Sequence, residues 1–133
     1  MQENHTKSRV YKFRAWDKVS KKILYQESLA ILTNGKVIIT APKVLDVNQK
    51  DETYLDRTGE FEIQQFTGLL DKKGKEIYEG DIIRCGDYVE DAGAYNEWQS
   101  EVVWNNEQGM WQGIDGERNE IIGNIYSNPE LIK

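Results

Sequence analysis

The residues that could perform nucleophilic, acid–base or zinc chemistry are few and scattered in this chain. One histidine, His5, and one cysteine, Cys85, are present. A serine or cysteine nucleophile with a histidine base needs convergent groups, and zinc needs a larger set of Cys and His ligands. The glycines from Gly74 to Gly80 lack the spacing of a phosphate-binding loop. We therefore expect a protein that is not an enzyme and that carries no metal and no cofactor.

Carboxylates are plentiful, and they form two groups. One group lies in an acidic segment: Asp87, Glu90 and Asp91. It lacks the spacing of a calcium-binding loop, so we expect solvated side chains there. The other group borders glycine turns: Asp71, Glu79 and Asp81. We expect these oxygens to accept hydrogen bonds from nearby backbone N–H groups. A small hydrolase using paired carboxylates stays open as a third-ranked alternative.

Aromatic residues in the acidic segment are candidates for partner binding. Tyr88, Tyr95 and Trp98 alternate with acids and polar residues between Gly86 and Ser100. Two interpretations remain open for them. They could cover one end of a barrel, or they could form a recognition surface, since exposed Tyr and Trp favour partner contacts.

Positive charge is concentrated near the N-terminus, although the chain has a net charge of −6. The candidate phosphate-facing residues are Lys12, Arg14, Lys18, Lys21 and Lys22. They could be solvated strand faces, or they could meet an acidic surface in the same chain or a neighbouring one. They also make nucleic-acid binding an alternative, although the acidic remainder of the chain would repel a phosphate backbone.

Hydrophobic alternation predicts short strands throughout. In the N-terminal half it predicts strands over 10–16 and 23–25, then a hairpin of 29–32 with 36–40 around Asn34-Gly35. A short helix over 27–32 is the alternative to the first strand of that hairpin. A further short strand is predicted over 44–47. The first strand should direct Tyr11, Phe13 and Ala15 to one face and Lys12 and Arg14 to the other.

In the C-terminal half, the predicted strands cover 60–66, 82–85, 101–104, 110–114 and 120–126. Gly68 is expected to end the first of them, and 86–100 is expected to be a long loop. Trp16, Trp104, Trp111 and Tyr126 are expected in the core. Short strands with glycine turns and little helix predict a mainly β fold, a sandwich or small barrel.

The expected organisation has three parts: a frayed N-terminus over 1–9, an N-terminal subdomain rich in β-hairpins over 10–59, and a C-terminal barrel subdomain over 60–133. Aromatic residues make up 11% of the chain, which argues against disorder. The start of the sequence is too polar for a signal peptide, and no apolar run is long enough to span a membrane. A single cysteine suits a reducing compartment. We expect a cytoplasmic protein with no membrane partner.

Four ordered blocks of sequence resemble the YopX family, whose members are small proteins of bacteriophages and prophages. The blocks are Lys12-Phe-Arg-Ala-Trp-Asp17, the stretch from Phe66 to Ile83, Val102-Val-Trp104 with Trp111, and Ile122 to Leu131. The resemblance implies an SH3-like small barrel in the C-terminal part, an oligomer and the cytoplasm of a bacterial host. It implies no catalytic residue and no established activity.

The leading hypothesis is therefore a phage or prophage accessory protein, a self-associating interaction module that binds a phage or host protein. Its contacts would come from the Tyr88–Trp98 segment or from the basic N-terminal hairpin. Nucleic-acid binding through the basic strand face is the second hypothesis.

Overall fold

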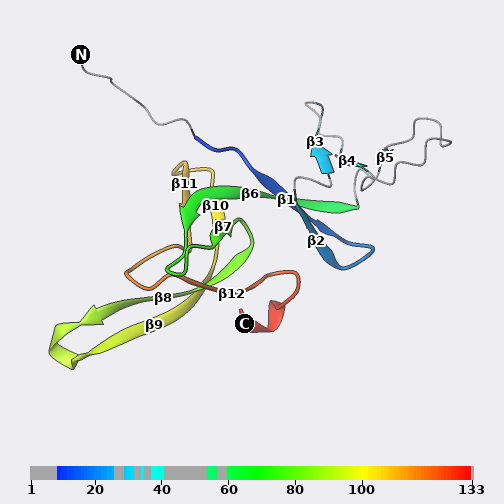
Figure 1. The fold of residues 1–133 in the computed structure, drawn as a ribbon. Helices are drawn as coiled ribbons and strands as arrows, with labels where there is room; N and C mark the ends of the chain where they lie inside the picture. The colour runs from blue at the N-terminus through cyan, green and yellow to red at the C-terminus, as the bar shows by residue number, and fades with distance from the viewer. Residues whose placement is uncertain are drawn as a thin grey trace, which may run out of the picture.

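The computed structural model describes residues 9–25, 29–31, 34, 37–40, 54–56 and 60–132. The fold is mainly β, with sheet that curls into a half-barrel (Figure 1). Within the described residues, no helix has the length and apolar character needed to cross a bilayer. His5 and the strand predicted over 44–47 lie outside the described ranges.

One sheet contains strands from both predicted subdomains. Its order is β2-β1-β6-β7, formed by β1 (Phe13–Asp17), β2 (Lys22–Tyr25), β6 (Phe61–Leu70) and β7 (Glu76–Tyr78). The antiparallel register pairs Ala15 with Leu24 on one side and with Ile63 on the other. The strands before and after residues 26–59 are therefore neighbours in one sheet. The predicted hairpin of 10–16 with 23–25 is confirmed in its pairing, although β1 begins at Phe13.

A second sheet has the order β12-β8-β9, formed by β8 (Asp81–Val89), β9 (Ala94–Glu101) and β12 (Glu120–Asn124). The strands β10 (Val103–Asn105) and β11 (Met110–Gln112) form a hairpin, as predicted for this segment. Two single turns of 3-10 helix complete this half, η2 (Glu90–Ala92) and η3 (Pro129–Leu131).

A third sheet has the order β3-β4-β5, formed by β3 (Leu29–Ile31), β4 (Val37–Thr40) and β5 (Tyr54–Asp56). The antiparallel pairing of β3 with β4 confirms the hairpin predicted around Asn34. The alternative of a helix over 27–32 is wrong for residues 29–31, which are strand.

The expectation that Lys12 and Arg14 share an outward face is wrong for Arg14. Only 6% of Arg14 is exposed, and the next three residues are buried as well. The reason is that side chains pack on both faces of β1. Tyr78 and Asp81 contact Arg14 on one face, and Ala15 belongs to a core cluster with Phe61 on the other. A strand covered on both faces loses the alternation that a half-exposed strand shows.

Gly68 does not end β6, which runs on to Leu70. The register with β7 shifts between Phe66 and Leu70, and Gly68 has a φ of +88°. A bulge needs such a backbone conformation, and glycine adopts it without the steric cost of a side chain. The glycine therefore bends the strand instead of terminating it.

The prediction of a long loop over 86–100 is also wrong, because these residues form a two-stranded ribbon. Strands β8 and β9 pair from Ile82 with Glu101 out to Val89 with Ala94, and η2 closes the end. Most of its outer residues are exposed on both faces, so no inward apolar face marked it as sheet in the sequence. Figure 1 shows the ribbon projecting from the remainder of the molecule, away from β1 and β2.

Two hydrophobic clusters form the core. Ala15 and Phe61 form one, and the other contains the buried residues Ile77, Ile83, Cys85 and Val102. Of the four aromatics expected in the core, Trp16 is buried and stacks on the half-buried Tyr126, with ring centroids 5.6 Å apart. Trp111 is half-buried against the second cluster. Trp104 is 43% exposed, so that expectation was wrong. It is the direct cross-strand partner of Trp111 and lies edge-on to that ring, with ring centroids 5.1 Å apart.

Candidate functional site

A buried polar cluster is built around Arg14 where β1 meets the start of β8. The Arg14 Nε donates a hydrogen bond to Gln64 Oε1 at 2.6 Å, and Nη2 donates to Asp81 Oδ1 at 2.6 Å. The guanidinium also lies over the ring of Tyr78, 4.6 Å from its centroid. All four residues are buried. A buried charge requires such compensation, because removing it from water is costly.

Burial changes the acidity of two members of this cluster. Desolvation raises the pKa of the Asp81 carboxyl, against the opposing effects of Arg14 and of the Tyr78 N–H, which donates to Asp81 Oδ2 at 2.8 Å. Desolvation and the neighbouring Glu76 raise the pKa of Tyr78 to about 12. The Tyr78 hydroxyl is thereby moved further from neutral pH. The hydrogen bonds and the ring contact hold the Arg14 guanidinium in a fixed position.

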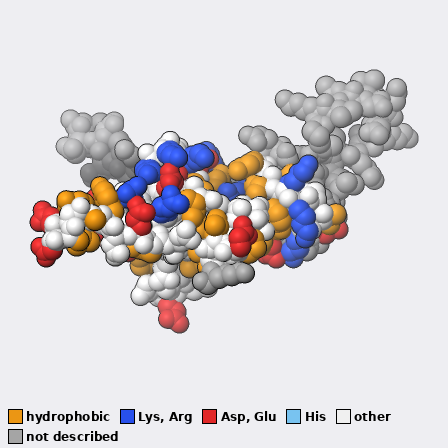
Figure 2. All heavy atoms as spheres, turned by 90° about the horizontal axis from the view of Figure 1, so that it is seen from below, with side chains coloured by type: hydrophobic (Ala, Val, Ile, Leu, Met, Phe, Trp, Pro, Cys, Tyr) orange, Lys and Arg blue, Asp and Glu red, His pale blue; other side chains and the backbone are white. Residues whose placement is uncertain are grey.

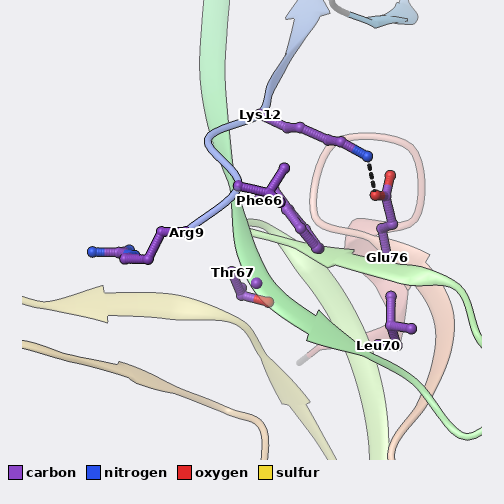
Figure 3. A pocket seen from close by; sticks show the side chains of 8 residues that line it. Arg9, Lys12, Phe66, Thr67, Leu70 and Glu76 are labelled. Atoms are coloured by element: carbon purple, nitrogen blue, oxygen red, sulfur yellow. Dashed lines mark hydrogen bonds and ion pairs between the residues drawn. The ribbon is translucent and has the colours of Figure 1, made fainter. Parts of the chain in front are cut away.

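A surface pocket of about 440 Å³ lies beside this cluster, between the segment before β1 and the end of β6 (Figure 3). Figure 3 shows Lys12 and Glu76 pointing toward each other, and their side chains form an ion pair. The Lys12 ammonium group also lies 5.6 Å from the centroid of the Phe66 ring. Arg9 points away from this pair in Figure 3. Lys12 thus belongs to a pocket wall and already has an anionic partner.

The predicted phosphate-facing set is divided by the fold. Arg14 is buried, and Lys12 pairs with Glu76 at a distance from the turn that follows β1. Lys18, on that turn, pairs with Glu62 at 3.0 Å. Lys21, on the same turn, and Lys22, at the start of β2, are both exposed. The structure therefore brings together the three lysines of the β1–β2 hairpin and separates them from the other two residues.

The three aromatic candidates are also divided. Tyr88 and Tyr95 are direct cross-strand partners on the ribbon, with ring centroids 5.4 Å apart in an edge-on arrangement. They are 48% and 46% exposed. Trp98 is half-buried and packs against the second core cluster. Tyr88 and Tyr95 thus offer a surface, whereas Trp98 covers the core.

Charged residues flank the tyrosine pair. Arg118 lies over the Tyr95 ring, 4.5 Å from its centroid, and pairs with Glu97 at 2.7 Å. Glu90 and Asp91 are exposed in η2 at the end of the ribbon. Figure 2 shows acidic side chains at this end of the molecule, with hydrophobic side chains beside them. The ribbon therefore presents an apolar aromatic surface with an acidic tip.

Among the carboxylates beside the glycine turns, Asp71 accepts hydrogen bonds from nearby N–H groups as the sequence predicts, whereas Glu79 accepts one from a distant strand. Asp71 Oδ1 accepts hydrogen bonds from the N–H groups of Lys73 and Lys75, both at 2.9 Å, and Oδ2 accepts from Ile121 N–H at 3.1 Å. Glu79 Oε1 accepts from Gln65 N–H at 3.3 Å. Asp71 thus holds its own turn and links that turn to β12.

No group of three or more Asp, Glu, His or Cys side chains converges for a metal among the residues that the structure describes. Cys85 is fully buried, and burial raises the pKa of its thiol. A thiol of this kind is a poor nucleophile, because the thiolate is the reactive form.

Sequence reasoning missed the Arg14 cluster, because it treated Arg14 as a surface charge and Asp81 only as a turn residue. One signal was available. Arg14 and Asp81 both lie within the blocks that carry the family resemblance. Charged residues inside such blocks, next to apolar residues, can indicate a buried pair.

Comparisons with a family model and with solved structures relate this chain to other proteins, whereas the comparison with curated proteins found no match. Among solved structures, the chain is similar to the crystal structure of protein EF1440 from Enterococcus faecalis. The two share 25% sequence identity with a TM-score of 0.59, over 95% of this chain and 100% of that chain. The family model of the YopX protein matches residues 12–133. The chain therefore belongs to the YopX family.

Proposed function

We propose that this protein is a non-enzymatic accessory protein of a phage or prophage, acting in the bacterial cytoplasm, that self-associates and binds a phage or host protein through the β8–β9 ribbon. The observation that carries the proposal is the exposed Tyr88–Tyr95 pair on a strand pair that projects from the sheet. Tyrosine is enriched at protein interfaces because it supplies a large rigid area with few rotatable bonds.

The edge of the ribbon supports the same proposal. In the sheet order β12-β8-β9, strand β9 is terminal, and its outer edge has no partner strand within the described ranges. Such an edge presents N–H and C=O groups that another strand can pair with. Val89, 39% exposed near the end of the ribbon, adds apolar surface to the opposite face from the tyrosines. An added strand would extend the sheet and bury these side chains.

Light scattering after size exclusion tests the self-association. The wild-type chain is expected to show a mass above the 15.5 kDa monomer, and a Tyr88→Ser/Tyr95→Ser variant is expected to shift toward the monomer. Val19→Ser is the matched control, because Val19 is 67% exposed on the turn after β1, away from the ribbon. A monomeric wild type at every concentration would remove the self-association. Unchanged association in the double variant would remove the role of the ribbon.

Partner binding is tested by pull-down from phage-infected cells with the same three proteins. A partner that is captured by wild type and by Val19→Ser, and lost with the double variant, supports the ribbon as its site. Equal capture by all three proteins would place the partner elsewhere.

Nucleic-acid binding is the second candidate function, supported by one observation. Lys18, Lys21 and Lys22 lie together at the β1–β2 hairpin, although Lys18 already has Glu62 as a partner. Retention on DNA or RNA that weakens steeply with salt and is lost in a Lys21→Glu/Lys22→Glu variant would support it. A gel-shift series that shows no binding at low salt would exclude it.

A further inference from the structure

A second pocket, of about 450 Å³, opens directly onto the Arg14 cluster. Five strands contribute to its lining: Arg14 of β1, Tyr25 of β2, Tyr78 of β7, Asp81 of β8 and Ile121 of β12. Lys75, which precedes β7, lines it as well. This volume lies within the range of pockets that hold small organic molecules, about 300–1,000 Å³.

The guanidinium of Arg14 has donors left for a ligand. Its Nε and Nη2 are bonded to Gln64 and Asp81, whereas Nη1 has no hydrogen-bond partner among the described residues. A guanidinium carries five N–H donors, and Nη1 reaches solvent, because it is not among the fully buried atoms that lack a partner. The contacts to Gln64, Asp81 and the Tyr78 ring hold the group in place. The pocket therefore contains a fixed and only partly satisfied cation.

The charges around the pocket favour an anion. Asp81 is compensated by Arg14 and by the N–H of Tyr78. Glu76, also in the lining, pairs with Lys12 outside it. Lys75 has no carboxylate within ion-pair distance in the described part of the chain. The net positive charge that remains is thus on Lys75, which also acts on Asp71, and Arg14 Nη1 adds an N–H donor without further net charge. Because Asp81 and Glu76 stay close, a monoanion suits the pocket better than a phosphate dianion.

The side chains that line the pocket indicate what kind of molecule carries the anionic group. Tyr25 is 48% exposed and lies edge-on to Tyr78, with ring centroids 6.2 Å apart. Ile121 adds an aliphatic side chain to the lining. We propose that this pocket binds a small organic carboxylate with an aromatic or apolar body, with its carboxylate at Arg14 and Lys75 and its body against Tyr25 and Ile121. A carboxylate matches the fork of N–H donors of a guanidinium.

Three probes test the proposal on the full chain: benzoate, its neutral isostere benzamide, and inorganic phosphate. Two-dimensional NMR follows the Arg14 side-chain Nε–H signal and the amides of Ile121 and Gly123. Benzoate is expected to shift these signals to saturation, whereas benzamide and phosphate are expected to leave them unchanged. Equal saturation by benzamide, saturation by phosphate, or no saturation by benzoate would each overturn the proposal.

Variants at the pocket rim avoid the risk that a change at buried Arg14 prevents folding. Lys75→Gln is expected to weaken benzoate binding by up to about fivefold, the range of a solvent-exposed ion pair. Tyr25→Ala is expected to weaken it as well. Lys22→Gln, which also removes a lysine charge but lies outside the lining, is the matched control and is expected to bind as wild type does. Full benzoate affinity in both rim variants would refute this site. These outcomes do not depend on the ribbon, so they test the pocket independently of self-association.

Discussion

The Nη2 atom of Arg14 lies 2.6 Å from Oδ1 of Asp81, although the two residues are separated by 67 positions in the chain. This ion pair connects β1 of one sheet to the first residue of β8 in another. It thus joins the N-terminal hairpin to the C-terminal half of the protein. A substitution in this pair should therefore change the free energy of unfolding.

Removing one partner of this pair should strongly destabilise the protein. Asp81→Ala leaves the Arg14 guanidinium buried without a counter-charge and leaves the Tyr78 N–H without its acceptor. We expect the free energy of unfolding in urea to fall by about 3–5 kcal/mol. The control is Glu62→Gln, which breaks the exposed pair with Lys18 and should change stability by no more than about 1 kcal/mol.

The double variant Arg14→Met/Asp81→Leu separates the charge effect from the packing effect. It removes both charges and should lose less stability than Asp81→Ala, since no uncompensated charge remains. A double variant that is less stable than the single one would show that the pair itself is strongly stabilising.

Asp71 should make stability depend on pH at the acidic end. Burial raises the pKa of this carboxyl, but the hydrogen bonds from the N–H groups of Ile121, Lys75 and Lys73 outweigh burial and lower it. A folded-state pKa below the unfolded value of 3.8 means that the carboxylate stabilises the fold above that pH. This contribution is lost as the pH falls through the lowered folded pKa.

Urea unfolding at pH 7 and pH 3 measures this effect. Asp71→Asn keeps an acceptor oxygen but cannot titrate, so its stability should fall less than that of wild type between the two pH values. An equal fall in both proteins would assign the acid sensitivity to other groups.

A side chain at Gly113 should destabilise the fold more than one at Gly74. Its φ is +94°, and a Cβ there would overlap the carbonyl oxygen of Glu101. Gly74 has a similar φ of +84°, but a Cβ there would have no neighbour within 4 Å. We expect Gly74→Ala to cost about 1–2 kcal/mol from backbone strain alone, and Gly113→Ala about 2–5 kcal/mol because the overlap is added. Thermal unfolding of the two variants gives the comparison, and equal losses would contradict the overlap.

Cys85 should react with a thiol reagent only when the protein opens. The side chain is fully buried, its Sγ lies 3.2 Å from the Gly113 carbonyl oxygen, and burial raises the pKa of the thiol. Labelling with Ellman's reagent should be slow in buffer and fast in denaturing urea. Fast labelling of the native protein would show that this part of the core opens readily. Gly113→Ala, which perturbs the neighbouring backbone, should accelerate native labelling more than Gly74→Ala does.

Much of the local structure was readable from the sequence. Asn34 marked the hairpin of β3 with β4, and Gly74 and Gly80 marked turns in which both have positive φ. Asp71 was correctly expected to accept hydrogen bonds from its own turn. These features depend on residues close together in the chain, where backbone sterics and short hydrogen bonds determine the conformation.

The candidate sites were readable only in part. Aromatic residues in a polar segment predict a recognition surface at Tyr88 and Tyr95, and both residues are exposed. Their pairing across a ribbon was not readable, because a strand pair exposed on both faces has no alternating apolar pattern. Trp98 resembled them in the sequence but turns toward the core, which is a consequence of its position opposite Cys85 on β8.

By itself, the sequence determined the family, the mainly β class and the turns, because these follow from ordered motifs and from short-range preferences. Only the tertiary structure decided that β1 lies between β2 and β6, and that Arg14 therefore meets Asp81 and Gln64 in the interior. The physical reason is that the burial of a side chain depends on which groups pack over its face of the sheet, here Asp81 and Tyr78 over Arg14. These contacts join segments that are far apart in the chain, and no local pattern records them.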